Sequence, residues 1–81
     1  MDRSEIERRV IQVVSRVLSI DEDDIQPEHH FVFDLGADSS QSVQLVDAFE
    51  EEFQIEMDRE AALAVKTVGE AVDFIAEYVN R

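Results

Sequence analysis

The sequence predicts an all-α protein, a small antiparallel bundle of three long helices and one short helix with a long first loop. Apolar residues recur at helical spacing in three segments, and no segment reads convincingly as a strand. Capping-box patterns also stand where three of the helices are expected to begin. The 81 residues are 44% hydrophobic, which suffices for one small core. We therefore expect residues 1–81 to form a single domain.

The first helix is expected from about Glu5 to Leu18. Ser4 stands at a helix-cap position with Glu7 three residues later, which is the pattern of a capping box. One face of the segment is apolar at helical spacing; it comprises Ile6, Val10, Val13, Val14 and Val17.

A long connection follows, from about Ser19 to Asp34, and it contains the only proline, Pro27. A loop this long in a small domain is usually functional or packed. Its apolar residues are therefore expected to anchor it across the bundle; they are Ile20, Ile25, Phe31, Val32 and Phe33.

The second helix is expected to begin at Asp38 or Ser39 and to end near Phe53. Asp38 and Gln41 form a capping-box pattern, and Gly36 supplies a permissive backbone for the turn before it. The residues predicted to face the core are Val46, Phe49 and Phe53, with Val43 or Leu45 beside them. The residues predicted to face water are Gln41, Gln44, Asp47 and Glu51.

Two helices complete the bundle. Asp58 is expected to cap a short helix from Arg59 to about Val65. Thr67 and Glu70 form a third capping box, which opens a last helix reaching about Tyr78. One face of that helix is apolar; it comprises Val68, Ala71, Val72, Ile75 and Val79.

The charge is strongly negative and unevenly distributed. The formal net charge is −13, and thirteen acids with no base lie between Arg16 and Arg59. Such a field repels nucleic acid and anionic lipid and attracts basic protein surfaces, although solubility alone could also account for it. There is no cysteine and no apolar run long enough to span a membrane. No signal peptide is visible, so we expect a cytoplasmic protein.

The hydroxyl of Ser39 stands at the start of the second helix, where unpaired N–H groups and the helix dipole suit a phosphate ester. The ordered set of segments around it resembles the acyl carrier proteins over essentially the full length. The segments that carry the resemblance are Phe31-Val32-Phe33-Asp34-Leu35-Gly36-Ala37-Asp38-Ser39, Leu45-Val46, Glu50-Glu51-Glu52-Phe53, and Thr67-Val68-Gly69-Glu70-Ala71-Val72.

The resemblance implies a 4'-phosphopantetheine arm attached to Ser39 by a phosphopantetheinyl transferase, and a thiol on that arm that carries acyl groups as thioesters. The carrier itself then catalyses nothing, and the expected pathway is fatty-acid or lipid biosynthesis. The implied partners are the transferase and acyl-transferring or fatty-acid-synthase-type enzymes with basic patches, and the carrier is expected to be a monomer. The implied recognition residues are Asp38, Ser40, Gln41, Gln44, Asp47, Glu50 and Glu51. The implied acyl cavity is lined by Val46, Phe49, Phe53, Ala62, Val65 and Ile75. Phe49 stands where the family often has leucine, which predicts a smaller cavity.

The chain departs from the housekeeping fatty-acid carriers it resembles. Ser40 stands where leucine is usual, Gln41 and Gln44 where acids are usual, and Asp47 where an apolar residue is frequent. Moving charges changes which partners are favoured and which are excluded. The departures therefore favour a specialised carrier of the fatty-acid type. The alternatives are a carrier of polyketide, peptide or other acyl intermediates, and an unmodified acidic docking module.

No metal site or catalytic constellation is predicted. Adjacent His29 and His30 lack further spaced ligands, which makes zinc a poor interpretation. An EF-hand starting at Asp21 would place Ile25 and Val32 at ligand positions, so calcium fails as well. There is no nucleophile–base pair and no phosphate-binding glycine loop, so we do not expect an enzyme.

Overall fold

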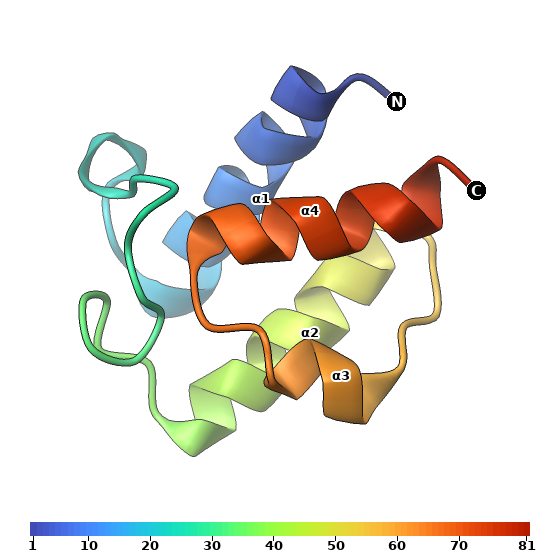
Figure 1. Ribbon diagram of the computed structural model, residues 1–81. Helices are drawn as coiled ribbons and strands as arrows, with labels where there is room; N and C mark the ends of the chain where they lie inside the picture. Colours follow the sequence, from blue (N-terminus) through green and yellow to red (C-terminus); the bar gives the residue numbers. More distant parts are fainter.

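The computed structural model describes residues 1–81 and confirms an all-helical fold (Figure 1). Its elements are α1 (Arg3–Leu18), the 3-10 turn η1 (Glu22–Asp24), α2 (Ser39–Phe53), α3 (Arg59–Leu63) and α4 (Val68–Val79). Helix α1 packs against both α2 and α4, and the short α3 lies beside α2. None of the helices is both long and apolar enough to cross a membrane.

Helix α1 begins earlier than predicted, and the capping box assigned to Ser4 is wrong. Asp2 is the N-cap, and its side chain accepts a hydrogen bond from the Ser4 N–H at 3.4 Å. Aspartate caps a helix as well as serine does, so the helix starts at Arg3 and Ser4 falls within its first turn. The helix ends at Leu18, as predicted, and its C-cap Ser19 has a left-handed φ of 57°.

The other capping patterns are confirmed. In α2, Asp38 accepts from the Gln41 N–H at 2.8 Å while the Gln41 side chain accepts from the Asp38 N–H at 3.1 Å. Thr67 and Glu70 form the same reciprocal pair at the start of α4.

Asp58 caps α3 as predicted, but this helix ends at Leu63 rather than at Val65. Beyond α3 the chain pairs with the long loop, where the Lys66 carbonyl accepts a hydrogen bond from the Phe31 N–H at 2.9 Å.

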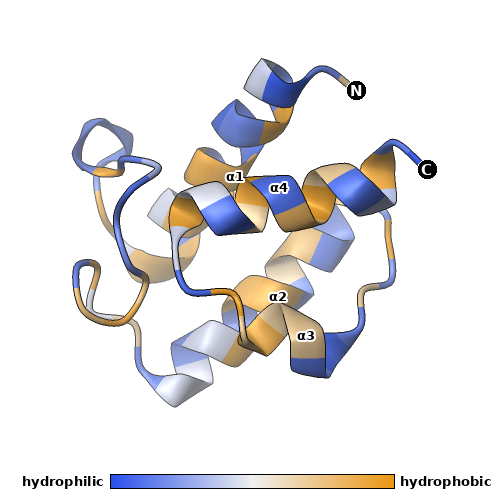
Figure 2. Cartoon of the chain, viewed as in Figure 1, coloured by the Kyte–Doolittle hydropathy of each residue, from blue (hydrophilic) through white to orange (hydrophobic).

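The core is wholly apolar, with sixteen buried residues and no buried polar one. The apolar faces of the helices turn towards one another, while the hydrophilic residues lie outside (Figure 2). The predicted stripes are confirmed at Ile6, Val10, Val13 and Val14 of α1, at Val46, Phe49 and Phe53 of α2, and at Val68, Ala71, Val72 and Ile75 of α4. Leu45 completes the face of α2, since Val43 is 39% exposed.

The long loop is anchored by Ile25 and Phe31, but the prediction that Val32 and Phe33 anchor it is wrong. Val32 is 47% exposed and Phe33 is 84% exposed. The chain reverses directly after Phe31, because its carbonyl accepts from the Ala37 N–H at 2.9 Å and the Val32 carbonyl accepts from Gly36 at 3.1 Å. Residues 32–36 therefore form a projecting turn instead of crossing the bundle.

Candidate functional site

Ser39 is the first residue of α2 and is exposed. Its hydroxyl makes no hydrogen bond within the protein, whereas the Ser42 hydroxyl donates to the Asp38 carbonyl at 3.0 Å. The backbone N–H groups of Ser39 and Ser40 also lack partners, as expected for the first turn of a helix. A free hydroxyl thus lies beside two free amide donors. Ser42, a rival hydroxyl in the sequence, is already engaged.

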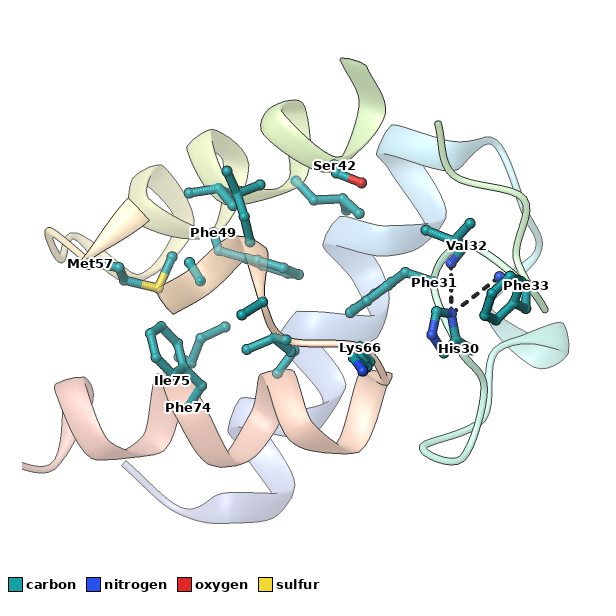
Figure 3. Close-up of a pocket in the computed structure, with 17 residues that line it drawn as sticks. His30, Phe31, Val32, Phe33, Ser42, Phe49, Met57, Lys66, Phe74 and Ile75 are labelled. Carbon is teal, nitrogen blue, oxygen red and sulfur yellow. Dashed lines mark hydrogen bonds between the residues drawn. The ribbon is translucent and has the colours of Figure 1, made fainter. Parts of the chain in front are cut away.

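The turn before Ser39 is held by several hydrogen bonds. Gly36 has a φ of 74°, a left-handed conformation that favours glycine. The His30 N–H donates to Asp34 at 2.6 Å, and His30 Nδ1 accepts from the N–H groups of Val32 and Phe33 at 3.1 and 3.2 Å. These contacts fix the point at which α2 begins and leave the Phe33 ring stacked against His30 (Figure 3).

The two histidines act as loop acceptors. His29 Nδ1 accepts from the Gln26 N–H at 3.0 Å, in the way that His30 serves the following turn. No three His, Cys, Asp or Glu side chains gather as a metal site.

An apolar cavity of about 450 Å³ lies between α2, α3, α4 and the projecting turn (Figure 3). Fourteen of its seventeen lining residues are hydrophobic. Five of the six residues predicted to line an acyl cavity do line this one; they are Val46, Phe49, Ala62, Val65 and Ile75. Phe53 does not, because it faces α1, where the Arg9 guanidinium lies over its ring at 4.9 Å.

Sequence reasoning missed other lining residues. They include Met57, Phe74, Val32, Phe33 and Leu63. Phe74 lies at the edge of the apolar face of α4, and this position in the helical pattern could have identified it as a lining residue. Nothing in the periodicity marks Met57, which lies in the connection before α3.

The acids of α2 differ in whether they are paired. Arg9 pairs with Glu52 at 2.8 Å and also donates to the Glu52 carbonyl at 2.7 Å. Arg59 of α3 pairs with Asp47 at 2.5 Å and lies 3.9 Å from Glu50. The Glu51 carboxylate has no partner within the protein.

The pair with Asp47 raises the pKa of Arg59, first through the hydrogen bond and then through the charges of Asp47 and Glu50. A base whose pKa is raised in the folded protein contributes its full stabilisation at every pH below its ordinary pKa. The Arg59–Asp47 pair therefore stabilises the fold at neutral pH.

Gln44, Asp47 and Glu51 lie exposed on α2, as predicted, and Ser40 is exposed as well. Gln41 is also predicted to face water but is half-buried, and its side chain takes part in the cap. Glu50 is also half-buried, and one of its carboxylate oxygens accepts from the Met57 N–H at 2.9 Å. The predicted recognition residues therefore lie on α2 and at its N-cap, and three of them, Asp38, Gln41 and Glu50, also make hydrogen bonds that hold the fold together.

Comparison with known families identifies the family of the chain. The sequence profile described as "Phosphopantetheine attachment site" matches residues 8–75, which is most of the chain. The chain belongs to the phosphopantetheine attachment-site family. Its members carry a covalent 4'-phosphopantetheine and interact with a phosphopantetheinyl transferase and with acyl-handling enzymes.

The start of α2 fits this prosthetic group. An attachment site needs an accessible hydroxyl, and the phosphodiester that forms there needs hydrogen-bond donors. The exposed first turn of α2 offers two hydroxyls, those of Ser39 and Ser40, together with their unpaired N–H groups at the positive end of the helix dipole.

Proposed function

We propose that Ser39 is the attachment residue and that this chain carries acyl intermediates for fatty-acid or lipid biosynthesis. The observation that carries the proposal is the free, exposed Ser39 hydroxyl at the first position of α2, directly after the Asp38 cap. When bound, the prosthetic group supplies a thiol that holds an acyl group as a thioester. The chain itself would position that group and shield its acyl part, and would not catalyse a reaction.

The cavity supports an acyl cargo. Burying apolar surface is favourable by about 25 cal/mol per Å², and the walls of Val46, Phe49 and Ile75 offer such surface. Tethering the cargo also raises its effective concentration at each enzyme that acts on it.

The surface of α2 is proposed as the docking face. Asp38, Asp47, Glu50 and Glu51 give it negative charge, which suits enzymes with basic patches and makes encounter faster at low salt. Ser40, Gln41 and Gln44 supply its neutral positions. We further propose that the protein acts as a monomer in the cytoplasm.

The neutral positions favour a specialised carrier over a housekeeping one. The test is to give the double variant Ser40→Leu, Gln44→Glu and wild type to a housekeeping fatty-acid enzyme at two salt concentrations. The added rim charge is worth about 0.2–1 kcal/mol, so the variant should be turned over up to about fivefold faster at low salt. Equal turnover of the two proteins would instead indicate an ordinary fatty-acid carrier.

Two alternatives remain. A carrier of other acyl intermediates would hold a different acyl group, and an unmodified docking module would carry no phosphopantetheine. The second alternative is separated by mass, since a docking module would gain no prosthetic group when coexpressed with a broad-specificity transferase.

A further inference from the structure

Helix α3 forms one wall of the cavity and buries little apolar surface. It is five residues long and none of its residues is buried. Ala62 and Leu63 nevertheless line the cavity opposite Val46 and Phe49 of α2. Because apolar burial of α3 is slight, its position depends strongly on polar contacts at its N-terminal end.

Those polar contacts are few. The Asp58 N–H donates to the Tyr78 hydroxyl at 3.1 Å, which joins the start of α3 to α4. Two contacts join it to α2. The Met57 N–H, directly before the Asp58 cap, donates to Glu50 at 2.9 Å, and the Arg59 guanidinium lies 2.5 Å from Asp47 and 3.9 Å from Glu50. We call the contact of Arg59 with Asp47 and Glu50 the α3 latch. Asp47 directly follows the cavity residue Val46, so the latch joins the two helices that form this wall.

The α3 latch is open to competition from outside. The Arg59 side chain is 50% exposed and that of Asp47 is 57% exposed, while that of Glu50 is 25% exposed, so Asp47 is the more accessible of the two carboxylates. Arg59 and Lys66 are the only Lys or Arg residues between Arg16 and Arg81, and the Lys66 ammonium has no carboxylate partner. Arg59 is therefore the only internal cation with which an incoming guanidinium or ammonium would compete for Asp47 and Glu50.

We propose that Arg59 holds α3 against α2 over the cavity, and that a basic side chain of a docking enzyme releases α3 by binding Asp47 and Glu50 in its place. This inference rests on the proposed function, since it assumes an acyl cargo in the cavity and docking on α2. It assigns Arg59 a positioning role. The residue keeps the cargo shielded in the free carrier and gives way when a suitable partner arrives.

The strength of an exposed ion pair suits such a device. Exposed pairs shift equilibria by up to about fivefold and are weakened by salt. A partner cation can therefore displace Arg59 at little cost to the partner's own binding free energy. Added salt should also weaken the contact of Arg59 with Asp47 and Glu50.

The first experiment measures shielding of the cargo. Wild type, Arg59→Gln and Arg8→Gln are converted to the octanoyl thioester, and its cleavage by hydroxylamine is followed by mass. Arg8 is exposed on α1 without an ion-pair partner, so its variant matches the change in charge alone. Arg59→Gln should be cleaved about two- to fivefold faster than both others, and Arg59→Lys should restore much of the shielding. Added salt should raise the cleavage rate of wild type towards that of Arg59→Gln, and should leave the cleavage rate of Arg59→Gln nearly unchanged.

Equal cleavage of correctly loaded wild type and Arg59→Gln would overturn the latch. Failure to load Ser39 at all would instead overturn the proposed function, and intact mass distinguishes the two results before cleavage begins.

The second experiment measures docking. A broad-specificity phosphopantetheinyl transferase is given coenzyme A and the three apo-proteins, and the KM for each carrier is determined. Removing the internal competitor should lower KM about two- to fivefold for Arg59→Gln and by less for Arg8→Gln. An unchanged or raised KM for Arg59→Gln would show that the enzyme does not compete with Arg59, and would overturn the proposal.

Discussion

Replacing Phe49 with leucine is expected to lengthen the acyl chain that the cavity protects. Phe49 is 5% exposed and lines the cavity, so a smaller side chain leaves room for additional cargo. Phe53 is also buried on α2, but it does not line the cavity. Phe53→Leu is therefore a matched control, because it removes the same atoms from the same helix.

The magnitude follows from the burial of methylene groups. Each methylene that enters an apolar site gains about 0.8 kcal/mol, which is about a fourfold change in the ratio of shielded to exposed thioester. In wild type, cleavage should slow by up to about fourfold for each methylene until the cavity is full, and then level off. Phe49→Leu should level off at least one methylene later. Both variants should lose roughly 1 kcal/mol of folding stability, which the control accounts for.

The assay is hydroxylamine cleavage of a series of thioesters on the holo-protein, from butyryl to dodecanoyl, followed by intact mass. Cleavage rates that do not depend on chain length would refute shielding by the cavity. An equal shift in Phe49→Leu and Phe53→Leu would refute the assignment of Phe49 to its wall.

Three further predictions concern the loop, the cap and the charge. Phe31→Ala should cost about 3–5 kcal/mol of unfolding free energy and Phe33→Ala less than about 0.5 kcal/mol in urea titrations, and a reversed order would contradict the projecting turn. Asp38→Asn should keep stability within about 0.5 kcal/mol, because asparagine also caps helices, while lowering the transferase kcat/KM; a large loss of stability would show that the charge itself holds the cap. Added salt, and magnesium more strongly, should raise the melting temperature because thirteen acids lie between Arg16 and Arg59, and a constant melting temperature would contradict this repulsion.

Much of the fold could be predicted because local signals agreed with the global pattern. The reciprocal caps of Asp38 with Gln41 and of Thr67 with Glu70 fixed the starts of α2 and α4. Helical periodicity identified the buried faces, because a single core lies on one side of each long helix. The start of α1 was misplaced because Asp2 and Ser4 are both good caps, and sequence alone does not rank two caps two residues apart.

The site was less predictable where tertiary contacts decide the outcome. The apolar side chain of Phe33 predicts an anchor of the long loop, yet the chain reverses where the Ala37 N–H donates to the Phe31 carbonyl, and Phe33 is exposed. Phe53 shares the apolar face of α2 with Phe49, but the approach of α1 to the end of α2 places it against Arg9 instead of the cavity. The pairing of Arg59 with Asp47 joins residues of different helices, and no periodicity reports such a contact.

The central claim is that the Ser39 hydroxyl receives the prosthetic group. The most direct measurement is intact mass and peptide mapping of wild type, Ser39→Ala and Ser40→Ala after coexpression with a broad-specificity phosphopantetheinyl transferase. Ser40 is the matched control, since its hydroxyl is also exposed and unbonded in the first turn of α2. The account predicts one phosphopantetheine on Ser39 in wild type and in Ser40→Ala, and none in Ser39→Ala. A Ser39→Ala protein that still gains the group, or a wild-type protein modified at Ser40, would contradict it.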